Sequence, residues 1–330
     1  MNELEYRYQK RRPTLMAANA LYLLAAAGTI TAGFVIGTIL YAFQFSFTEA
    51  SYEIFNTVLN TTIEISLFLL PATLYAVNHR GVSLSMRLTS PSVRHMLFAV
   101  ISAPVAAIFI NGVSVLWTGL IELTGGVIPP SSLPIPTDRR GLLLSTLSIG
   151  IMPGICEEVL FRGAILGAWE RRGTRYAIVV SALLFCALHG SVAGLPAQLG
   201  MGLLLGYIVV ITDSLYVGML YHSMYNITLV VLSYIAAVGQ PEPAAETALS
   251  ALEIMPEILL PTLFYGALFM FTLRLITHGN RARSASIEKV RVPNREKMPW
   301  MELLVLIVGI ITVMYGYIND LAEIYRWFGL

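Results

Sequence analysis

Long runs of apolar residues dominate the chain, and most of them have the length that crosses a lipid bilayer. A helical span needs about 20 mainly apolar residues, and this criterion predicts roughly nine spans. The fifth and sixth are short and meet at a helix-breaking stretch with Gly190, Gly194 and Pro196. The pattern therefore predicts an all-α polytopic transmembrane bundle, with spans at 15–43, 54–77, 96–123, 142–169, 175–190, 195–211, 214–238, 256–278 and 300–322.

Composition supports the membrane assignment. The 330 residues are 56% hydrophobic and 12% charged, and the mean hydropathy is +0.70. Soluble domains carry about 25% charged residues, so an ordinary soluble domain is excluded. Both cysteines lie in apolar segments, which argues against a disulfide framework. The net charge of +1 decides little. The expected partner is the lipid bilayer, and no nucleic acid is expected.

Basic residues indicate the orientation of the spans. With a cytoplasmic N-terminus and alternating spans, the cytoplasmic segments hold 17 of the 21 Lys and Arg. This bias follows the positive-inside rule and predicts a multi-pass protein of the cell membrane, with the N-terminus inside. The basic loop 279–298 is expected to be a solvated linker. The cytoplasmic basic residues are Arg7, Lys10, Arg11, Arg12, Arg80, Arg87, Arg94, Arg171, Arg172, Arg175, Arg274, Arg281, Arg283, Lys289, Arg291, Arg295 and Lys297.

Three charges stand inside the fourth span, in the sequence GICEEVLFRG at 154–163. Each would cost about 2.5–3.5 kcal/mol at mid-bilayer, so pairing must offset part of that cost. Glu158 and Arg162 are i,i+4 neighbours on a helix and can form an ion pair. Glu157 lies about 100° around the helix from Glu158. The spacing therefore predicts a Glu158–Arg162 pair and leaves Glu157 to interact with another helix or with water.

Two other spans present polar groups at a similar depth. His189 lies about 21 Å from Arg175, as Glu157 lies about 21 Å from Arg171, at the helical rise of 1.5 Å per residue. His222 and Asn226 share one face of the seventh span. Against a hydrocarbon core of about 30 Å, these groups can form a single cluster near mid-depth.

The residue types in this cluster suit water activation. A buried glutamate can act as a general base on water, and a histidine can orient that water. A second histidine and an asparagine amide can donate to a developing oxyanion. These residue types therefore point to a water-activating hydrolase, with an oxyanion that develops as it does in peptide hydrolysis.

Three motifs resemble those of the CPBP family, the CAAX protease and bacteriocin-processing family. The sequences EEVLFR (157–162), FCALH (185–189) and HSMYN (222–226) resemble its EExxxR, FxxxH and HxxxN/D motifs, in order and on separate predicted spans. The family includes the eukaryotic CAAX prenyl endopeptidases. The resemblance covers roughly 142–238, and the flanking spans carry none of it.

The resemblance implies roles for these residues. Glu157 would activate water with help from His189, and His222 and Asn226 would form the oxyanion hole. Glu158, Arg162 and Phe185 would support the site structurally. The activity implied is an intramembrane endopeptidase acting on membrane-associated peptide or protein substrates, either CAAX-type prenylated proteins or bacteriocin-like peptides. No cofactor is expected.

The resemblance also divides the chain into three parts. Residues 1–141 would hold three spans and an external Pro-rich loop at 124–141. Residues 142–238 would be the catalytic helical core. Residues 239–330 would add C-terminal spans and the basic cytoplasmic loop.

Other functions compete with the metal-free protease. Glu157, His189 and His222 offer a His₂Glu set for zinc, although HExxH is absent from the sequence. Intramembrane Glu, His and Arg also mark ion pathways, so a proton-coupled transporter is a second class. The third is a non-catalytic membrane scaffold or immunity factor.

Overall fold

The computed structural model describes residues 13–78, 86–129, 135–238, 251–291 and 299–325, and within them the chain is all-helical. The single-element spans are α2 (Leu15–Ala42), α6 (Val93–Leu123), α10 (Thr174–His189), α11 (Leu195–Thr212), α12 (Leu215–Val238), α13 (Ala251–Arg291) and α14 (Trp300–Tyr325). The second span joins α3 (Glu49–Ile63), the π-helix η1 (Glu64–Leu69) and α4 (Leu70–Asn78). The fourth joins α7 (Arg139–Ser145), η2 (Thr146–Ile151), α8 (Met152–Glu158), η3 (Val159–Ile165), α9 (Leu166–Trp169) and the 3₁₀-helix η4 (Glu170–Arg172).

The predicted span pattern is confirmed. Among the described residues, eight helices are long and apolar enough to cross a membrane. The predicted fifth span, α10, is helical but has 16 residues, about 24 Å at the usual rise, which is shorter than the hydrocarbon core of about 30 Å. The chain is therefore a multi-pass membrane protein whose fifth helix is too short to cross by itself.

The linker prediction for the basic segment is wrong over its first part. Helix α13 continues without interruption to Arg291, so residues 279–291 extend a membrane helix instead of forming a loop. The side chains of residues 281–291 and the whole of residues 292–298 lie outside the described part. The expected turn-rich loop is only partly described, because 130–134 are also outside it. Asp138 ends that loop, and its side chain accepts from Gly141 N at 2.7 Å to cap α7.

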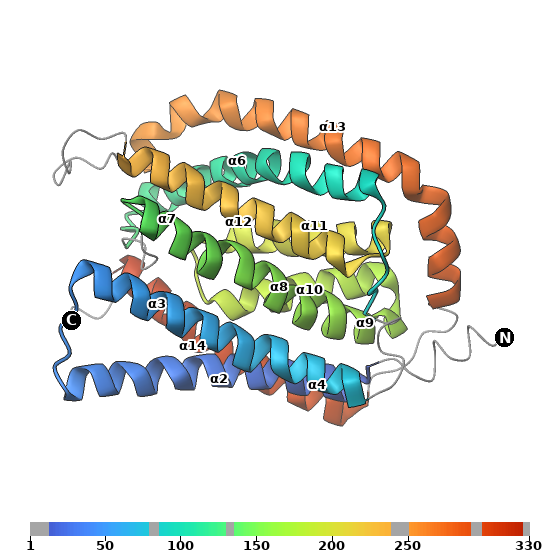
Figure 1. The fold of residues 1–330 in the computed structure, drawn as a ribbon, viewed down its shortest axis with the longest axis horizontal. Helices are drawn as coiled ribbons and strands as arrows, with labels where there is room; N and C mark the ends of the chain where they lie inside the picture. The colour runs from blue at the N-terminus through green and yellow to red at the C-terminus, as the bar shows by residue number, and fades with distance from the viewer. Residues whose placement is uncertain (1–12, 79–85, 130–134, 239–250, 292–298, 326–330) are drawn as a thin grey trace.

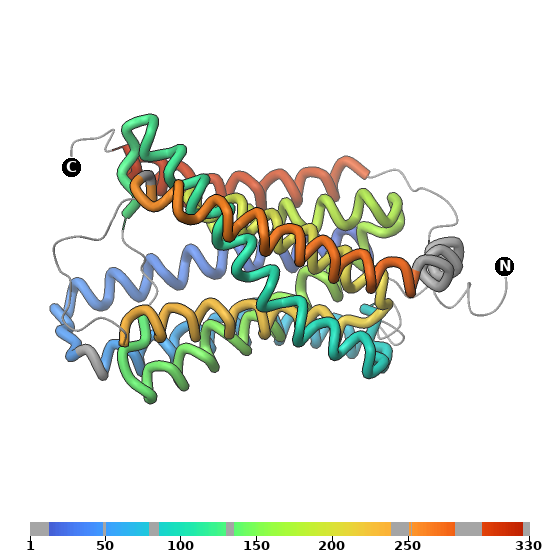
Figure 2. Tube along the Cα trace, turned by 90° about the horizontal axis from the view of Figure 1, so that it is seen from above, coloured from blue at the N-terminus to red at the C-terminus, as the bar shows by residue number. Residues whose placement is uncertain are grey.

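The helices run roughly along one common direction (Figure 1). Helix α2 begins at one end of the bundle and α14 finishes at the other (Figures 1 and 2). Helix α6 packs against α13 and α12, and α14 packs against α2. The fourth span lies between these layers, with η3 in contact with α2, α10 and α11.

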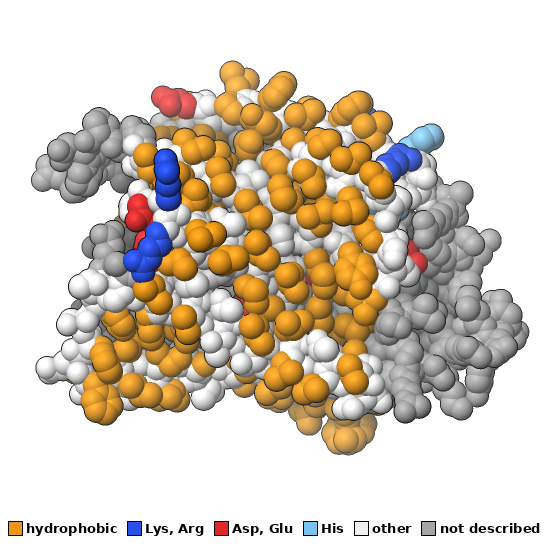
Figure 3. All heavy atoms as spheres, viewed as in Figure 1, with side chains coloured by type: hydrophobic (Ala, Val, Ile, Leu, Met, Phe, Trp, Pro, Cys, Tyr) orange, Lys and Arg blue, Asp and Glu red, His pale blue; other side chains and the backbone are white. Residues whose placement is uncertain are grey.

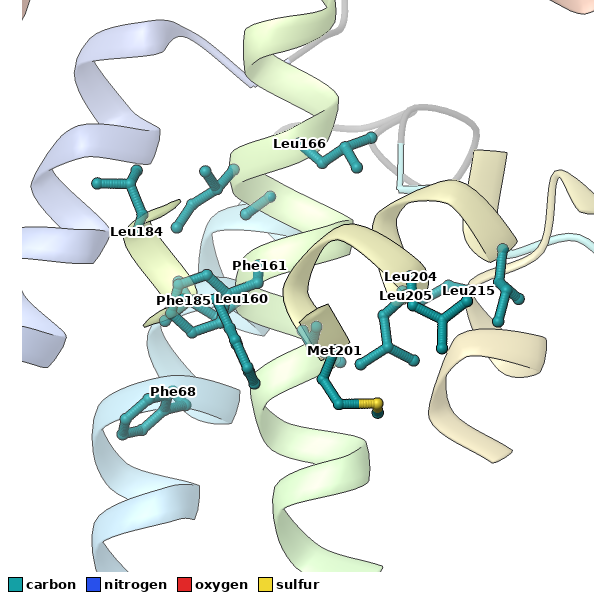
Figure 4. Packing of buried hydrophobic residues seen from close by; sticks show 14 of the residues in the cluster. Phe68, Leu160, Phe161, Leu166, Leu184, Phe185, Met201, Leu204, Leu205 and Leu215 are labelled. Atoms are coloured by element: carbon teal, nitrogen blue, oxygen red, sulfur yellow. The ribbon is translucent and has the colours of Figure 1, made fainter. Parts of the chain in front are cut away.

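Side chains of the fourth span fill the centre of the bundle. Every residue from Val159 to Trp169 is buried. Leu160, Phe161 and Phe185 pack together in the core, and Phe68 lies beside them (Figure 4). The face seen in Figure 3 is dominated by hydrophobic side chains, and most of its charged side chains lie near the helix ends. This distribution is the one expected of a bundle surrounded by lipid.

Candidate active site

Three π-helical segments occur in the described part of the chain, and each contributes to one region of the bundle. A π-helix bonds i to i+5 and widens the helical turn, and such segments are frequent at functional sites. The segment η1 begins at Glu64, η2 contains Ile149 and η3 contains Arg162. Segments η1 and η2 both pack against α8, which carries Glu157 and Glu158.

Glu158 and Arg162 form the ion pair that the spacing predicts. Arg162 Nη1 donates to Glu158 Oε1 at 2.6 Å, and both side chains are completely buried. Arg162 Nη2 donates to the Gly202 carbonyl of α11 at 3.1 Å. The guanidinium carbon lies 4.5 Å from the centre of the Phe185 ring, a cation–π distance. Three helices therefore share the burial of this one positive charge.

His222 also binds Glu158, which the spacing argument does not foresee. Its Nδ1 lies 3.1 Å from Glu158 Oε1, the oxygen that also accepts from Arg162. An ionised carboxylate oxygen can only accept hydrogen bonds, and Glu158 Oε1 is ionised beside the Arg162 cation. His222 Nδ1 must therefore be the donor in this bond. Glu158 Oε1 thus accepts hydrogen bonds from both Arg162 and His222. These two bonds join the EEVLFR segment to the HSMYN segment.

Glu157 lies on the other side of the same imidazole. Its Oε2 is 3.9 Å from His222 Nε2, too long for a direct hydrogen bond. The residue is 7% exposed. His222 therefore lies between two carboxylates. Glu158 is bonded and neutralised, and Glu157 keeps its oxygens free of a direct bond to the ring.

His189 reaches the cluster through Phe185. The His189 Nδ1–H donates to the Phe185 carbonyl at 2.8 Å, which leaves Nε2 as the nitrogen directed elsewhere. The Phe185 ring centre lies 4.8 Å from that of His189 and 5.9 Å from that of His222. His189 is exposed, whereas Glu157 and His222 are buried. It ends the short helix α10, and Gly190 follows it in the left-handed conformation with φ 60°.

Asn226 lies one turn beyond His222 on α12. Its Nδ2 donates to the Ile149 carbonyl of η2 at 3.1 Å. An amide nitrogen carries two hydrogens, so one remains for a further acceptor. The structure therefore brings five of the predicted residues into one cluster. His189 and Asn226 lie at the edges of this cluster. The five are Glu157, Glu158, Arg162, Phe185 and His222.

The close approach of α8 and α12 depends on Gly154. A Cβ placed on Gly154 would lie 2.8 Å from Ser223 N and 3.0 Å from Ser223 Cα. These distances are shorter than real Cβ atoms make to backbone. Small residues permit such contacts between membrane helices, and here the contact positions Glu157 beside His222.

One further carboxylate at this site is absent from the sequence prediction. Glu64 begins η1, which packs against α8, the helix that carries Glu157. The signal was available, because Glu64 is the only Asp, Glu, Lys or Arg within the predicted span 54–77. The insertion cost that draws attention to Glu157 applies equally to Glu64.

A metal set is not assembled here. Within the part of the chain that the structure describes, no three His, Cys, Asp or Glu residues are grouped so as to hold a metal ion. His222 directs its Nδ1 to Glu158, and His189 directs its Nδ1 to a carbonyl. Both bonds leave Nε2 available, as in histidines that bind metals, so they do not argue against the His₂Glu set, which stays an alternative. We derive no step through a metal.

The comparison with family models assigns this region. Residues 139–228 match the model of Rce1-like proteins, described as type II CAAX prenyl endopeptidases. The comparisons with curated proteins and with solved structures found no match. The matched segment begins with α7 and ends two residues after Asn226, so it contains all three motifs.

Proposed function

From the premise that residues 139–228 form an Rce1-like domain of the CPBP intramembrane proteases, we propose a glutamate mechanism for this chain. In it, Glu157 activates water to hydrolyse a peptide bond of a membrane-associated substrate. The observation that carries the proposal is the contrast between two adjacent carboxylates. Glu158 is held by Arg162 and His222, whereas Glu157 is close to His222 without a direct bond. A general base needs a carboxylate oxygen whose lone pair is not already used in a hydrogen bond to the protein. Glu157 meets this requirement with respect to His222.

The reaction follows general acid–base chemistry. Glu157 takes a proton from water as the water oxygen bonds to the carbonyl carbon of the scissile peptide. The carbonyl oxygen becomes an oxyanion in a tetrahedral intermediate. The C–N bond then breaks, and Glu157 returns its proton to the leaving nitrogen. One water is consumed, and the products are a carboxylic acid and an amine.

His222 and Asn226 would stabilise the oxyanion. His222 uses its Nδ1–H for Glu158, so donation from Nε2 requires the doubly protonated imidazolium. Asn226 holds Ile149 O with one amide hydrogen and would donate the second. Donors fixed in place before the reaction stabilise developing charge effectively.

His189 would position the attacking water. Its Nδ1–H is held by the Phe185 carbonyl, so the neutral ring offers a lone pair at Nε2. Its exposure at the end of α10 gives a substrate a way to the buried pair of Glu157 and His222. Phe185 keeps the two imidazoles in a fixed relation by contacting both rings.

The substrate class follows from the family and from the bilayer. The matched family description is that of CAAX prenyl endopeptidases, so we propose peptides anchored in the membrane. These are a prenylated C-terminal Cys-aliphatic-aliphatic-X sequence or a hydrophobic bacteriocin-like peptide. Both would bring the scissile bond to the depth of the site through an apolar anchor.

The domain division and orientation are part of the same proposal. Residues 1–141 and 239–330 would flank the catalytic part 142–238 and enclose it in the bundle. The positive-inside bias supports a cytoplasmic N-terminus in the cell membrane. Reporter fusions after Ala42, Leu123 and Val238 would report an outer location for all three, and an inner location for any of them would contradict this orientation.

The deciding experiment measures cleavage by purified protein in lipid nanodiscs. The probe is a fluorescence-quenched peptide ending in a farnesylated Cys-aliphatic-aliphatic-X sequence, with a bacteriocin-leader peptide as a second probe. Glu157→Gln should abolish cleavage and His189→Ala should reduce it by about 10²-fold or more, the usual contribution of acid–base groups. The proposal fails if both folded variants process a probe as fast as the parent.

The matched control is His95→Gln. His95 is a buried histidine whose Nε2 bonds Asn280 between α6 and α13, away from the carboxylates. This variant should keep the parent cleavage rate. Proton flux without cleavage that Glu157→Gln abolishes would favour the transporter. A cellular phenotype that survives Glu157→Ala would favour the scaffold or immunity factor. Activity lost to chelators and restored by zinc would favour the metalloprotease.

A further inference from the structure

The segment 190–194, which joins α10 to α11, turns within the thickness of the bilayer. Helix α10 has 16 residues and α11 has 18, which is about 24 Å and 27 Å at the helical rise. Both lengths are below the hydrocarbon core of about 30 Å. Irregular backbone at this depth needs hydrogen-bond partners from the protein, because lipid supplies none. His189 is the last residue of α10, so the partners of this turn also decide where His189 lies.

Tyr317 of α14 binds a carbonyl that the end of α10 leaves open. In a continued α-helix the Cys186 carbonyl would accept from the N–H of residue 190. The Gly190 N–H instead donates to the Ala187 carbonyl at 3.2 Å. The Tyr317 hydroxyl donates to the Cys186 carbonyl at 2.7 Å and takes the place of that N–H. Cys186 and His189 are i,i+3 neighbours, so this bond holds α10 one turn from His189.

Val192, three residues after His189, is bound from two flanking helices. Its backbone N–H donates to Asp320 Oδ2 of α14 at 2.6 Å. Its carbonyl accepts from the indole N–H of Trp117 of α6 at 2.9 Å. Both backbone groups of this one residue are therefore satisfied by side chains from outside the α10–α11 pair, which fixes the turn in space.

A close contact between two glycines lets α14 reach the turn. A Cβ on Gly190 would lie 3.3 Å from Gly316 Cα, and a Cβ on Gly316 would lie 3.3 Å from Gly190 Cα. Tyr317 follows Gly316 directly, and Asp320 is four residues after Gly316 on the same helix. Residues three and four apart share a helix face, so α14 turns one face toward the end of α10.

We propose that Asp320 and Tyr317 are positioning residues that hold the turn 190–194 and thereby place the His189 imidazole beside the reacting water. The inference rests on the proposed function for its catalytic meaning, because His189 positions the water there. Both residues act through the backbone of α10 and the turn. The C-terminal span thus takes part in the reaction, although α14 lies outside the matched residues 139–228.

Steady-state cleavage of the farnesylated probe in nanodiscs measures this role. Asp320→Ala and Tyr317→Phe should each lower kcat by about tenfold to a hundredfold, because a displacement of about 1 Å can cost about 10²-fold in rate. KM should stay close to the parent value, since neither side chain holds the substrate. The parent kcat in both variants would overturn the proposal.

Asp320→Asn tests whether the hydrogen bond itself is responsible. The amide oxygen of asparagine can still accept from the Val192 N–H, so this variant should recover kcat that Asp320→Ala loses. An asparagine variant as slow as the alanine variant would assign the loss to the missing charge and would overturn the bond to Val192 as its cause.

Tyr315→Phe and Glu323→Ala are the matched controls on the same helix. Tyr315 is 62% exposed, and Glu323 is also exposed. Both substitutions repeat the chemical change on side chains that face away from the turn, and both should keep the parent kcat. Equal losses in these controls would overturn the proposal, because the effect would then belong to α14 as a whole.

A double variant shows whether the effect passes through His189. In a His189→Ala background, Asp320→Ala should cause no further loss of kcat, because residues that act as a unit are not additive. A general loss of folded protein would lower the rate by the same factor in both backgrounds. A full additional loss in the double variant would therefore overturn the positioning role.

Hydrogen exchange of the backbone amides tests the same contact without a substrate. The Val192 N–H should exchange about fivefold faster or more in Asp320→Ala than in the parent, the effect of about one lost hydrogen bond. The amides of α12 should remain as protected as in the parent. Unchanged exchange at Val192 overturns the positioning role, even in a parent that cleaves the probe. A parent that cleaves neither peptide probe overturns the proposed function, even if the exchange shows that α14 holds the turn.

Discussion

The His222 imidazole donates its Nδ1–H to Glu158 Oε1 across 3.1 Å and so joins α12 to α8 at the centre of the bundle. The same oxygen accepts from Arg162 at 2.6 Å. A carboxylate that neutralises one buried cation also orients the ring that faces Glu157. Glu158 therefore has the structural role, and the adjacent Glu157 is the one left for the proposed reaction.

This division predicts opposite phenotypes for two amide substitutions. Glu158→Gln leaves the buried Arg162 without a counter-charge, and breaking a buried ion pair costs about 3–5 kcal/mol. Glu157→Gln removes no direct hydrogen bond to His222 and should leave stability close to that of the parent. Equilibrium unfolding in mixed detergent micelles measures both. Equal losses of stability in the two variants would contradict the division.

Arg162→Lys should destabilise the protein even though the charge is kept. The guanidinium reaches Glu158 and the Gly202 carbonyl at the same time and stacks on Phe185. An ammonium group lacks the planar fork for this geometry. One lost hydrogen bond with its buried carbonyl left unsatisfied costs about 1–3 kcal/mol. An unfolding midpoint equal to that of the parent would show that the fork is not required.

Gly154→Ala should impair activity through helix spacing alone. The new Cβ would meet the backbone of Ser223 at 2.8 Å, and backbone cannot move aside as a flexible side chain can. Separation of α8 from α12 would misplace Glu157 relative to His222, and a displacement of about 1 Å can cost about 10²-fold in rate. The measurement is kcat with the peptide probe.

Gly33→Ala is the control for that substitution. A Cβ on Gly33 of α2 meets nothing within 4 Å, so the same change of residue occurs without a clash. Its kcat should equal that of the parent. If both glycine variants lost activity to the same extent, the effect would come from helix flexibility and not from the contact with Ser223.

Asn226→Ala should lower kcat more than it raises KM. Loss of one oxyanion donor costs about 10²–10³ in kcat, because the donor acts on the intermediate and not on bound substrate. Thr228→Ala on the same helix is the control, since its hydroxyl bonds the Met224 carbonyl within α12. A change in KM alone for Asn226→Ala would place the amide in substrate binding.

The sequence alone was sufficient for the spans and for one ion pair. Runs of apolar residues place most of the membrane helices within a few residues of their observed ends, because a span must match the thickness of the bilayer. Helix α13 is the exception, since it continues to Arg291. The i,i+4 spacing places Glu158 beside Arg162, because that contact lies within one helix. The two histidines and Glu157 lie at similar depths along their spans, which is why the sequence could place them in one cluster. Depth by itself does not tell which group bonds to which.

Only the tertiary structure decided those partners. The bond from His222 to Glu158 and the bond from Asn226 to the Ile149 carbonyl both join different spans. Their geometry depends on how the helices are rotated and spaced, and π-helical turns change that rotation locally. The periodicity of apolar residues within one helix carries no information about how that helix is rotated relative to its neighbours. The close contact at Gly154 and the packing of η1, η2 and α12 against α8 supply it.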